Sequence, residues 1–191
     1  LKLGFRAHYP QLETKLTVRG ADLDDAHRKL APVEHEVRKR LGNFILAEDE
    51  KRLEGVILEA LRNKNASLCV VETLTGGAVT ARLAPLATAE NVFRQSIVAR
   101  NFSDLSVALG SDAGAFTQTS VQTAEAAART ARQKTNATHA LVVLVEIDTG
   151  ADRIDLGGTI CLAIATESAV VSRQARMLGG REWVRMGAVE M

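Results

Sequence analysis

The sequence predicts an α/β protein built from two domains. Residues 1–19 alternate apolar and polar side chains, which is typical of half-buried strands. From residue 67 onward, short runs of Val, Ile, Leu and Ala alternate with helical patterns, as in sheets covered on both faces. A cluster of charged residues at 48–52 separates the two regions. We therefore predict a first domain over residues 1–48 and a second over residues 49–191.

Three strands are expected in the first domain. Two of them lie within residues 1–19 and are joined around Tyr9 and Pro10. A short run at residues 43–46 has the composition of a third strand. Together with the helix described next, these strands predict a small ββαβ unit.

One long helix is expected between the second and third strands. Asp22 or Asp24 is suited to cap its start, since a carboxylate accepts hydrogen bonds from the first turn. Apolar residues then recur at helical spacing until Gly42 supplies a stop signal. Pro32 is expected to kink or split this helix.

The second domain is predicted to be a three-layer αβα sandwich with a largely parallel sheet, because its strands and helices alternate. Its expected elements, in order, are a helix that starts at the charged cluster 48–52 and carries an apolar stripe to residue 61, a strand over 67–71, a helix over 76–86, a strand over 92–99, an Ala-rich helix over 117–134 capped by Thr117, strands over 139–146 and 159–166, and a last helix from 180.

Composition excludes several classes of function. The chain has 24 Lys and Arg against 23 Asp and Glu, so a net charge of +1 gives no general attraction to nucleic acid or anionic lipid. No apolar run approaches the roughly 18 residues of a spanning helix, and no secretory signal is present, which favours a cytoplasmic protein. Cys69 and Cys161 lie in apolar runs typical of buried thiols. The four His are scattered, so neither a metal nor a cofactor is expected: His8, His27, His35 and His139.

A candidate ligand loop follows the first strand of the second domain. Residues 70–77 run from a buried strand into hydroxyl groups and the paired Gly76 and Gly77 at the start of a helix. Ligands bind at this place in open α/β sheets, and free N–H groups of a first helical turn favour an oxyanion or phosphate. Glu72, Thr75 and the two glycines are thus candidate ligand-binding residues. A tight strand-to-helix turn explains the same residues without a ligand.

Three charged residues also have two interpretations each. Glu72 is a candidate ligand contact, or a carboxylate that complements a helix N-terminus. Arg181 and Arg185 are four residues apart on one face of the last helix, where they are suited to hold a phosphate or to form surface ion pairs.

The loop sequence resembles a known family. Residues 72–77, E-T-L-T-G-G, are similar to the A-E-S-C-T-G-G segment of the CinA C-terminal family, the nicotinamide mononucleotide amidohydrolases. Further similarities follow in the family's order: Val92-Phe93-Arg94, Gly114-Ala115-Phe116-Thr117, Gly158-Thr159-Ile160, and Gly180-Arg181 with Arg185. Upstream, Gly4-Phe5-Arg6-Ala7, residues 16–20 and Arg40-Leu41-Gly42 resemble the KH-type middle domain of CinA. The resemblance implies a KH-type linker domain before an amidohydrolase-like domain. Because the chain opens at Leu1 in a strand pattern, an upstream CinA domain is expected to be missing from it.

The family's catalytic groups are not matched. The resemblance implies a Ser nucleophile assisted by the Tyr and Lys of a Y-S-N-E-A-K segment, with a G-x-A-G-P loop beside them. In this sequence these three positions hold Thr73, Arg100 and Leu105, and the Gly-Pro loop is missing around residues 146–150. A degenerate active site is the resulting prediction.

The inventory of bases supports the same prediction independently. A hydroxyl nucleophile needs a positioned base at neutral pH. The chain's one Tyr is Tyr9, in the first domain, and the sole Lys after Lys64 is Lys134, at the far end of a helix. His139 is the remaining candidate base for Thr73, although a strand-edge His bonded to backbone or water explains it equally.

Two functions therefore follow from the sequence. The first is a catalytically degenerate module that binds a mononucleotide, forms a homodimer or regulates the upstream domain. The alternative is an active deamidase in which Thr73 attacks nicotinamide mononucleotide to yield nicotinate mononucleotide and ammonia. The strand edge at residues 9–19 and the Ala-rich helix are the expected dimer surfaces. No nucleic-acid partner is expected, because the first domain lacks the G-x-x-G loop of KH modules.

Overall fold

The structure is a computed structural model that describes residues 1–8, 11–49, 51–112, 114–151 and 154–191. It divides into two compact units, Leu1–Leu53 and Glu54–Met191. The boundary predicted from the charged cluster, after residue 48, lies near this division. No helix in the described ranges is long and apolar enough to span a membrane.

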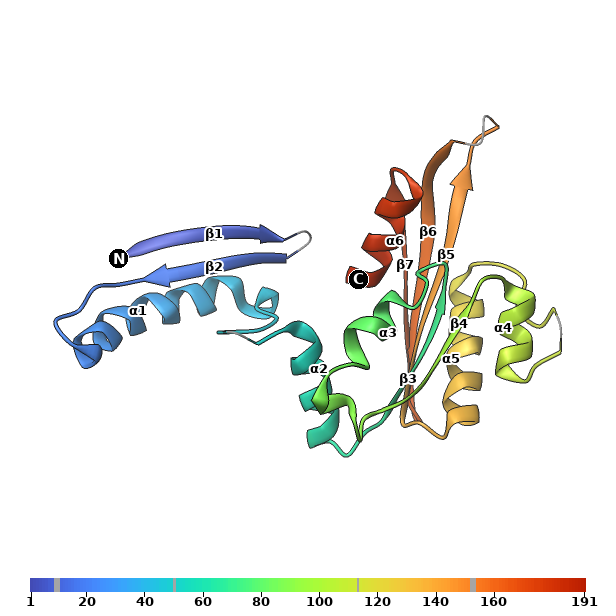
Figure 1. Cartoon of the computed structure of the whole chain (residues 1–191), viewed down its shortest axis with the longest axis horizontal. Coiled ribbons are helices and arrows are strands. Elements are labelled where there is room, and N and C mark those ends of the chain that lie inside the picture. The colour runs from blue at the N-terminus through green and yellow to red at the C-terminus, as the bar shows by residue number, and fades with distance from the viewer. Residues whose placement is uncertain (9–10, 50, 113, 152–153) are drawn as a thin grey trace. The chain divides into compact units, whose positions relative to one another are not determined.

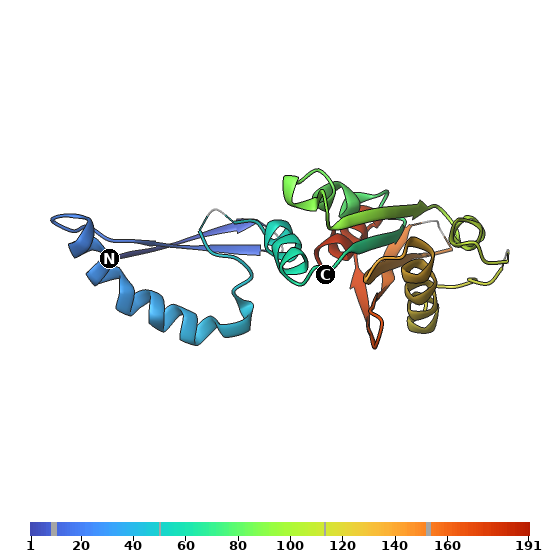
Figure 2. The same ribbon diagram turned by 90° about the horizontal axis from the view of Figure 1, so that it is seen from below.

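The first unit contains a β-hairpin and one helix (Figure 2). Strands β1 (Lys2–His8) and β2 (Gln11–Thr17) pair antiparallel, with Phe5 opposite Thr14. Helix α1 (Leu23–Leu41) begins where the Asp22 carboxylate accepts a hydrogen bond from the Asp25 backbone N–H at 2.7 Å. The two predicted strands, the helix and the Asp22 cap are confirmed.

A third strand and a split in the helix at Pro32 are not found in the described residues of this unit. Residues 43–46 form no strand, since Gly42–Phe44 is a 3-10 turn and none of the described strands pairs with the residues that follow. A run of four residues, three of them apolar, is too short to make a strand without a neighbouring ladder. Pro32 does not split α1, because it is exposed and the carbonyl group that it leaves unpaired is free to bind water.

The first unit has little core of its own. None of its described residues is buried, and α1 covers mainly the β2 side of the hairpin, where Thr14 and Leu16 are half-buried. On β1, Leu3 is 54% and Phe5 64% exposed, so the expected half-burial is wrong for this strand. An apolar face therefore remains open.

The second unit is a three-layer α/β domain, as predicted. Its five strands lie in the order β4-β3-β5-β6-β7, and the sheet is parallel from β4 through β5 and antiparallel from β5 through β7. Helices α3 and α6 cover one face, and α4 and α5 cover the other (Figure 1). The elements are α2 (Leu53–Asn63), β3 (Leu68–Thr73), α3 (Ala78–Leu83), a 3-10 turn (Ala87–Ala89), β4 (Phe93–Ala99), α4 (Phe102–Leu109), α5 (Val121–Thr135), β5 (His139–Thr149), β6 (Asp155–Ala165), β7 (Val170–Leu178) and α6 (Arg181–Glu190).

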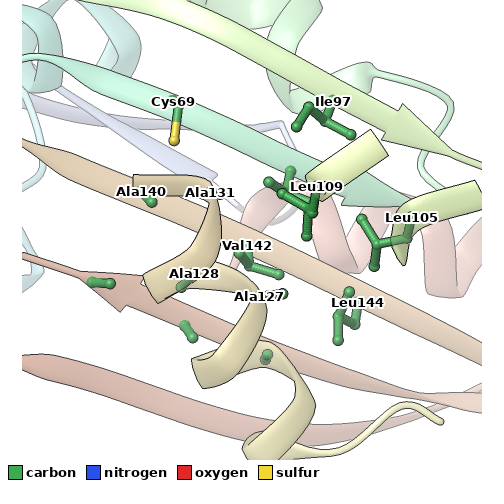
Figure 3. Packing of buried hydrophobic residues seen from close by; sticks show 14 of the residues in the cluster. Cys69, Ile97, Leu105, Leu109, Ala127, Ala128, Ala131, Ala140, Val142 and Leu144 are labelled. Carbon is green, nitrogen blue, oxygen red and sulfur yellow. The ribbon is translucent and has the colours of Figure 1, made fainter. Parts of the chain in front are cut away.

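Each face of the sheet carries its own hydrophobic core. On the α5 side, the fully buried side chains of the helix are all small, which lets it lie close to the strands (Figure 3). These fully buried residues are Ala124, Ala127, Ala128 and Ala131. On the other side, Leu58 of α2 and Val184 of α6 pack with Val70 and Ile160 of the sheet. The sheet is thereby held from both faces.

Several element boundaries differ from the prediction. The Ala-rich helix begins at Val121, where the Ser120 hydroxyl accepts from the Thr123 N–H at 3.1 Å, so the Thr117 cap is wrong. Helix α4 and strand β7 were not predicted. Strand β3 continues to Thr73, two residues beyond its predicted end. This extension places the first candidate site residues inside the sheet.

Candidate functional site

The candidate site lies at the carboxyl end of β3, in the parallel part of the sheet. Glu72 and Thr73 are the last residues of the strand, and Leu74–Gly77 connects them to α3. Thr73 is opposite Ala99 on β4, so Arg100 follows at the same edge of the sheet. Ligands bind at this edge in open α/β sheets.

The connecting loop has an unusual backbone. Leu74, Gly76 and Gly77 all have positive φ, at 61°, 70° and 84°. The left-handed region is disfavoured for a leucine, and Leu74 is held there while its side chain packs against the core. The two glycines adopt the same region without a steric penalty. Their presence is explained by this turn even with no ligand bound.

Glu72 is the centre of a buried hydrogen-bond network. Its carboxylate is completely buried and accepts from the Val79 N–H at 3.0 Å and the Thr80 N–H at 2.8 Å. The hydroxyl groups of Thr75 and Thr80 donate to it at 2.6 Å and 2.5 Å. The protein's own carboxylate thus takes two first-turn N–H groups that were expected to favour a bound oxyanion. This contact supports the structural interpretation of Glu72.

Thr73 connects two strands. Its hydroxyl accepts a hydrogen bond from the Val145 backbone N–H of β5 at 2.9 Å, and the residue is 4% exposed. A buried backbone N–H needs such a partner, because leaving it unpaired is costly. The Thr73 hydroxyl therefore satisfies a backbone group of the neighbouring strand.

His139 is too far away to act as the base for Thr73. Leu68 pairs with His139, and Thr73 lies five residues further along β3. At about 3.3 Å per residue, the two side chains start roughly 16 Å apart. The His139 Nδ1 atom instead lies 2.8 Å from the Thr138 hydroxyl. The pairing of Thr73 with His139 is wrong.

Arg100 and Leu105 have different surroundings. Arg100 is exposed immediately after β4. Leu105, on α4, is completely buried in the α5-side core next to Leu109 (Figure 3). Position 105 is therefore a core position, where a charged side chain would be shielded from water.

The two arginines of α6 form ion pairs. Arg181 Nε lies 3.1 Å from the Asp155 carboxylate, and Arg185 pairs with Glu182, whose pKa is lowered by the hydrogen bond from Arg185. Arg185 Nη1 also donates to the Thr75 carbonyl at 3.4 Å. The structure thus brings Arg185 to the candidate loop, whereas Arg181 is engaged at the start of β6.

Three contributions were not predicted from the sequence. Thr80 completes the Glu72 network. The sequence feature that could have predicted this contact is a hydroxyl side chain in the first helical turn after the glycine pair. Val145 contributes a backbone group, for which no sequence signal exists. Arg82 donates to both Glu54 of α2 and Glu190 of α6, and so connects α3 to both of these helices.

Replacing Thr73 with Val is expected to lower the free energy of unfolding by about 1–3 kcal/mol, because it leaves the buried Val145 N–H without an acceptor. Thr73→Ser keeps the acceptor and should lose less. Urea denaturation of the two variants measures the difference. Equal losses in both would show that the Thr73 hydroxyl is not what holds Val145.

Comparison with known proteins gives consistent matches. The model of the family described as "CinA C-terminal domain" matches residues 50–191. A CinA-like protein of Frankia casuarinae is 31% identical over 191 residues, covering 98% of this chain and 44% of the relative. One of Shewanella sediminis is 32% identical over 185 residues, covering 93% and 42%. The chain spans less than half the length of these curated relatives.

Solved structures share the fold of the second unit. A competence or damage-inducible protein from Enterobacter asburiae superposes with a TM-score of 0.62 at 20% identity, covering 73% of this chain and 92% of that protein. The competence/damage inducible protein of Agrobacterium tumefaciens gives 0.60 at 21% identity, covering 71% and 86%. At these identities the likeness concerns the fold alone.

Proposed function

The chain belongs to the CinA C-terminal domain family, and from that premise we propose that its second unit is an amidohydrolase-like module without catalytic activity, in a protein retained for binding or self-association. One observation carries this proposal: the hydroxyl at the nucleophile position accepts from the Val145 N–H inside the sheet. The positions of its expected assistants hold an exposed Arg100 and a buried Leu105. A nucleophilic hydroxyl needs a base to take its proton, and neither side chain supplies one.

We propose a mononucleotide as the ligand of this module. Arg185 contacts the loop through the Thr75 carbonyl, and Arg100 is exposed at the same edge of the sheet. Guanidinium groups bind phosphate through paired donors. Because Glu72 occupies the Val79 and Thr80 N–H groups, these arginines are the proposed phosphate contacts in place of the α3 N-terminus.

The alternative is an active deamidase, and the left-handed Leu74 favours it, since strained backbone is often found at functional sites. In that reaction the Thr73 oxygen attacks the amide carbonyl of nicotinamide mononucleotide and ammonia leaves. Water then hydrolyses the ester to nicotinate mononucleotide and restores the hydroxyl. The reaction requires a base within about 3 Å of the hydroxyl, or one water away.

The experiment that separates the two is ammonia release from nicotinamide mononucleotide, with Thr73→Ala as the matched variant and an active deamidase of the family as positive control. Circular dichroism verifies that both proteins are folded. We expect no release above buffer from either protein. Release by the native chain that disappears in Thr73→Ala would establish the alternative.

We also propose that the first unit is the KH-type linker of this family and that the protein works in the cytoplasm. The order of β1, β2 and α1 supports the first proposal. Cys69 and Cys161 are buried free thiols, and burial raises the pKa of both, as suits a reducing compartment.

A further inference from the structure

We propose that the outer edge of β2 is a self-association surface, where β2 pairs antiparallel with β2 of a second copy around a two-fold axis at Thr14. Among the described residues, the sheet of the first unit contains β1 and β2 alone, so one edge of each strand has no strand beside it. Such edges bind further strands unless charge or shape prevents it. The inference rests on the self-association role proposed above and names its surface.

The charges of β2 select the register. With the two-fold axis at Thr14, Glu13 of each copy lies opposite Lys15 of the other, and Leu12 lies opposite Leu16. An axis at Glu13 or at Lys15 places two like charges directly opposite each other, which is destabilising. A shift by one residue in the pairing would turn apolar side chains toward polar ones. The Thr14 register avoids both penalties and, unlike an axis at Leu12 or Leu16, it places Glu13 opposite Lys15.

The β1 edge is less suitable for the same reason. Its charged side chains are Lys2 and Arg6, with no acidic residue to balance them. An axis at Gly4 would place Lys2 opposite Arg6. By contrast, Glu13 already lies opposite Arg6 within the hairpin. Pairing through β2 would add Lys15 of the second copy on the other side of Glu13. Charges of opposite sign then alternate across the sheet.

The pairing would also bring exposed apolar side chains of the two copies together. Leu12 is 62% exposed and would gain Leu16 of the second copy as a cross-strand neighbour. Because the axis is perpendicular to the sheet, both α1 helices would lie on the same face. Four strands spaced about 4.8 Å apart match the width of two helices of roughly 10 Å each.

Sedimentation equilibrium of the full chain tests the proposal through charge reversal. We expect a dimer at tens of micromolar, and at least tenfold weaker association for Lys15→Glu and for Glu13→Lys, since each places like charges opposite each other. An equimolar mixture of these two variants should associate again. Lys2→Glu, with the same change of charge on β1, is the control and should associate like the native chain. A monomeric native chain, or equal effects of Lys15→Glu and Lys2→Glu, would overturn the proposal.

A cross-link tests the register itself. Thr14→Cys should form a disulfide-linked dimer on mild oxidation, because residues facing each other across an antiparallel pair have Cβ atoms about 5 Å apart. Gln11→Cys should not, because the two copies of residue 11 would lie roughly 20 Å apart along the strands. Equal cross-linking of both variants would contradict this register. Ammonia release is measured in a separate experiment. A failure of the proposed self-association can therefore be distinguished from a failure of the proposed lack of catalysis.

Discussion

Glu72→Gln is expected to lower the free energy of unfolding by about 3–5 kcal/mol, since two charge-assisted hydrogen bonds to one carboxylate oxygen are lost and an amide N–H₂ then faces donors. The carboxylate accepts four hydrogen bonds, from Thr75, Val79 and the N–H and hydroxyl of Thr80, and it is completely buried. Because the side chain has no exposed surface, bulk solvent does not reach it to replace these bonds. Urea denaturation followed by circular dichroism measures the loss.

Two variants calibrate this result. Thr80→Val removes one hydroxyl donor to Glu72 and should cost less than Glu72→Gln. Glu90→Gln makes the same chemical change at an exposed position and should stay within about 0.5 kcal/mol of the native chain. If Glu72→Gln were as mild as Glu90→Gln, the carboxylate would not anchor the turn, and a ligand-binding role for Glu72 would become the better explanation.

Leu105→Lys is expected to destabilise the second unit by roughly 4 kcal/mol or more at neutral pH, because it removes a core side chain and buries an ammonium group without a partner. Leu105→Met keeps the volume and polarity of the site and should cost less than about 1.5 kcal/mol. Near-native stability of Leu105→Lys would mean that position 105 is open to solvent, contrary to its burial here.

The pH dependence of Leu105→Lys has a defined sign. Burial disfavours the charged form of a Lys, so its pKa in the folded protein would lie below its value of about 10.4 in the unfolded chain. Between these two values the unfolded state binds more protons, and stability rises with pH. The urea midpoint of the variant, relative to the native chain, should therefore recover partly from neutral pH toward pH 10.

The sequence was most informative where burial and periodicity agree. The run at residues 68–71 and the run from His139 were both recognised as strands because they are apolar, and both are central in the sheet. Helix α4 was missed although Asn101 caps it and Gly110 ends it, because its eight residues are too short for a clear period. Strand β7 was missed because its edge position admits Arg173, Gln174 and Arg176, which obscure the alternation.

The location of the candidate site could be predicted from the sequence, but the partners of its side chains could not. Gly76 and Gly77 indicated the turn, and the positive φ values there confirm a tight connection. Whether Glu72 faces a ligand or the protein depends on where Thr80 lies after the turn, which residue spacing does not reveal. The partner of Thr73 is a backbone group of β5, reached through strand register alone.

The most direct test of the central claim is ammonia release from nicotinamide mononucleotide by Thr73→Ser. This variant introduces the serine that the family resemblance implies at position 73 and removes the extra methyl group, while Arg100 and Leu105 stay in place. If the missing base is what abolishes catalysis, the variant should remain inactive although it is folded. Ammonia release by Thr73→Ser above that of Thr73→Ala would show that a base is present near the loop and would contradict a degenerate site.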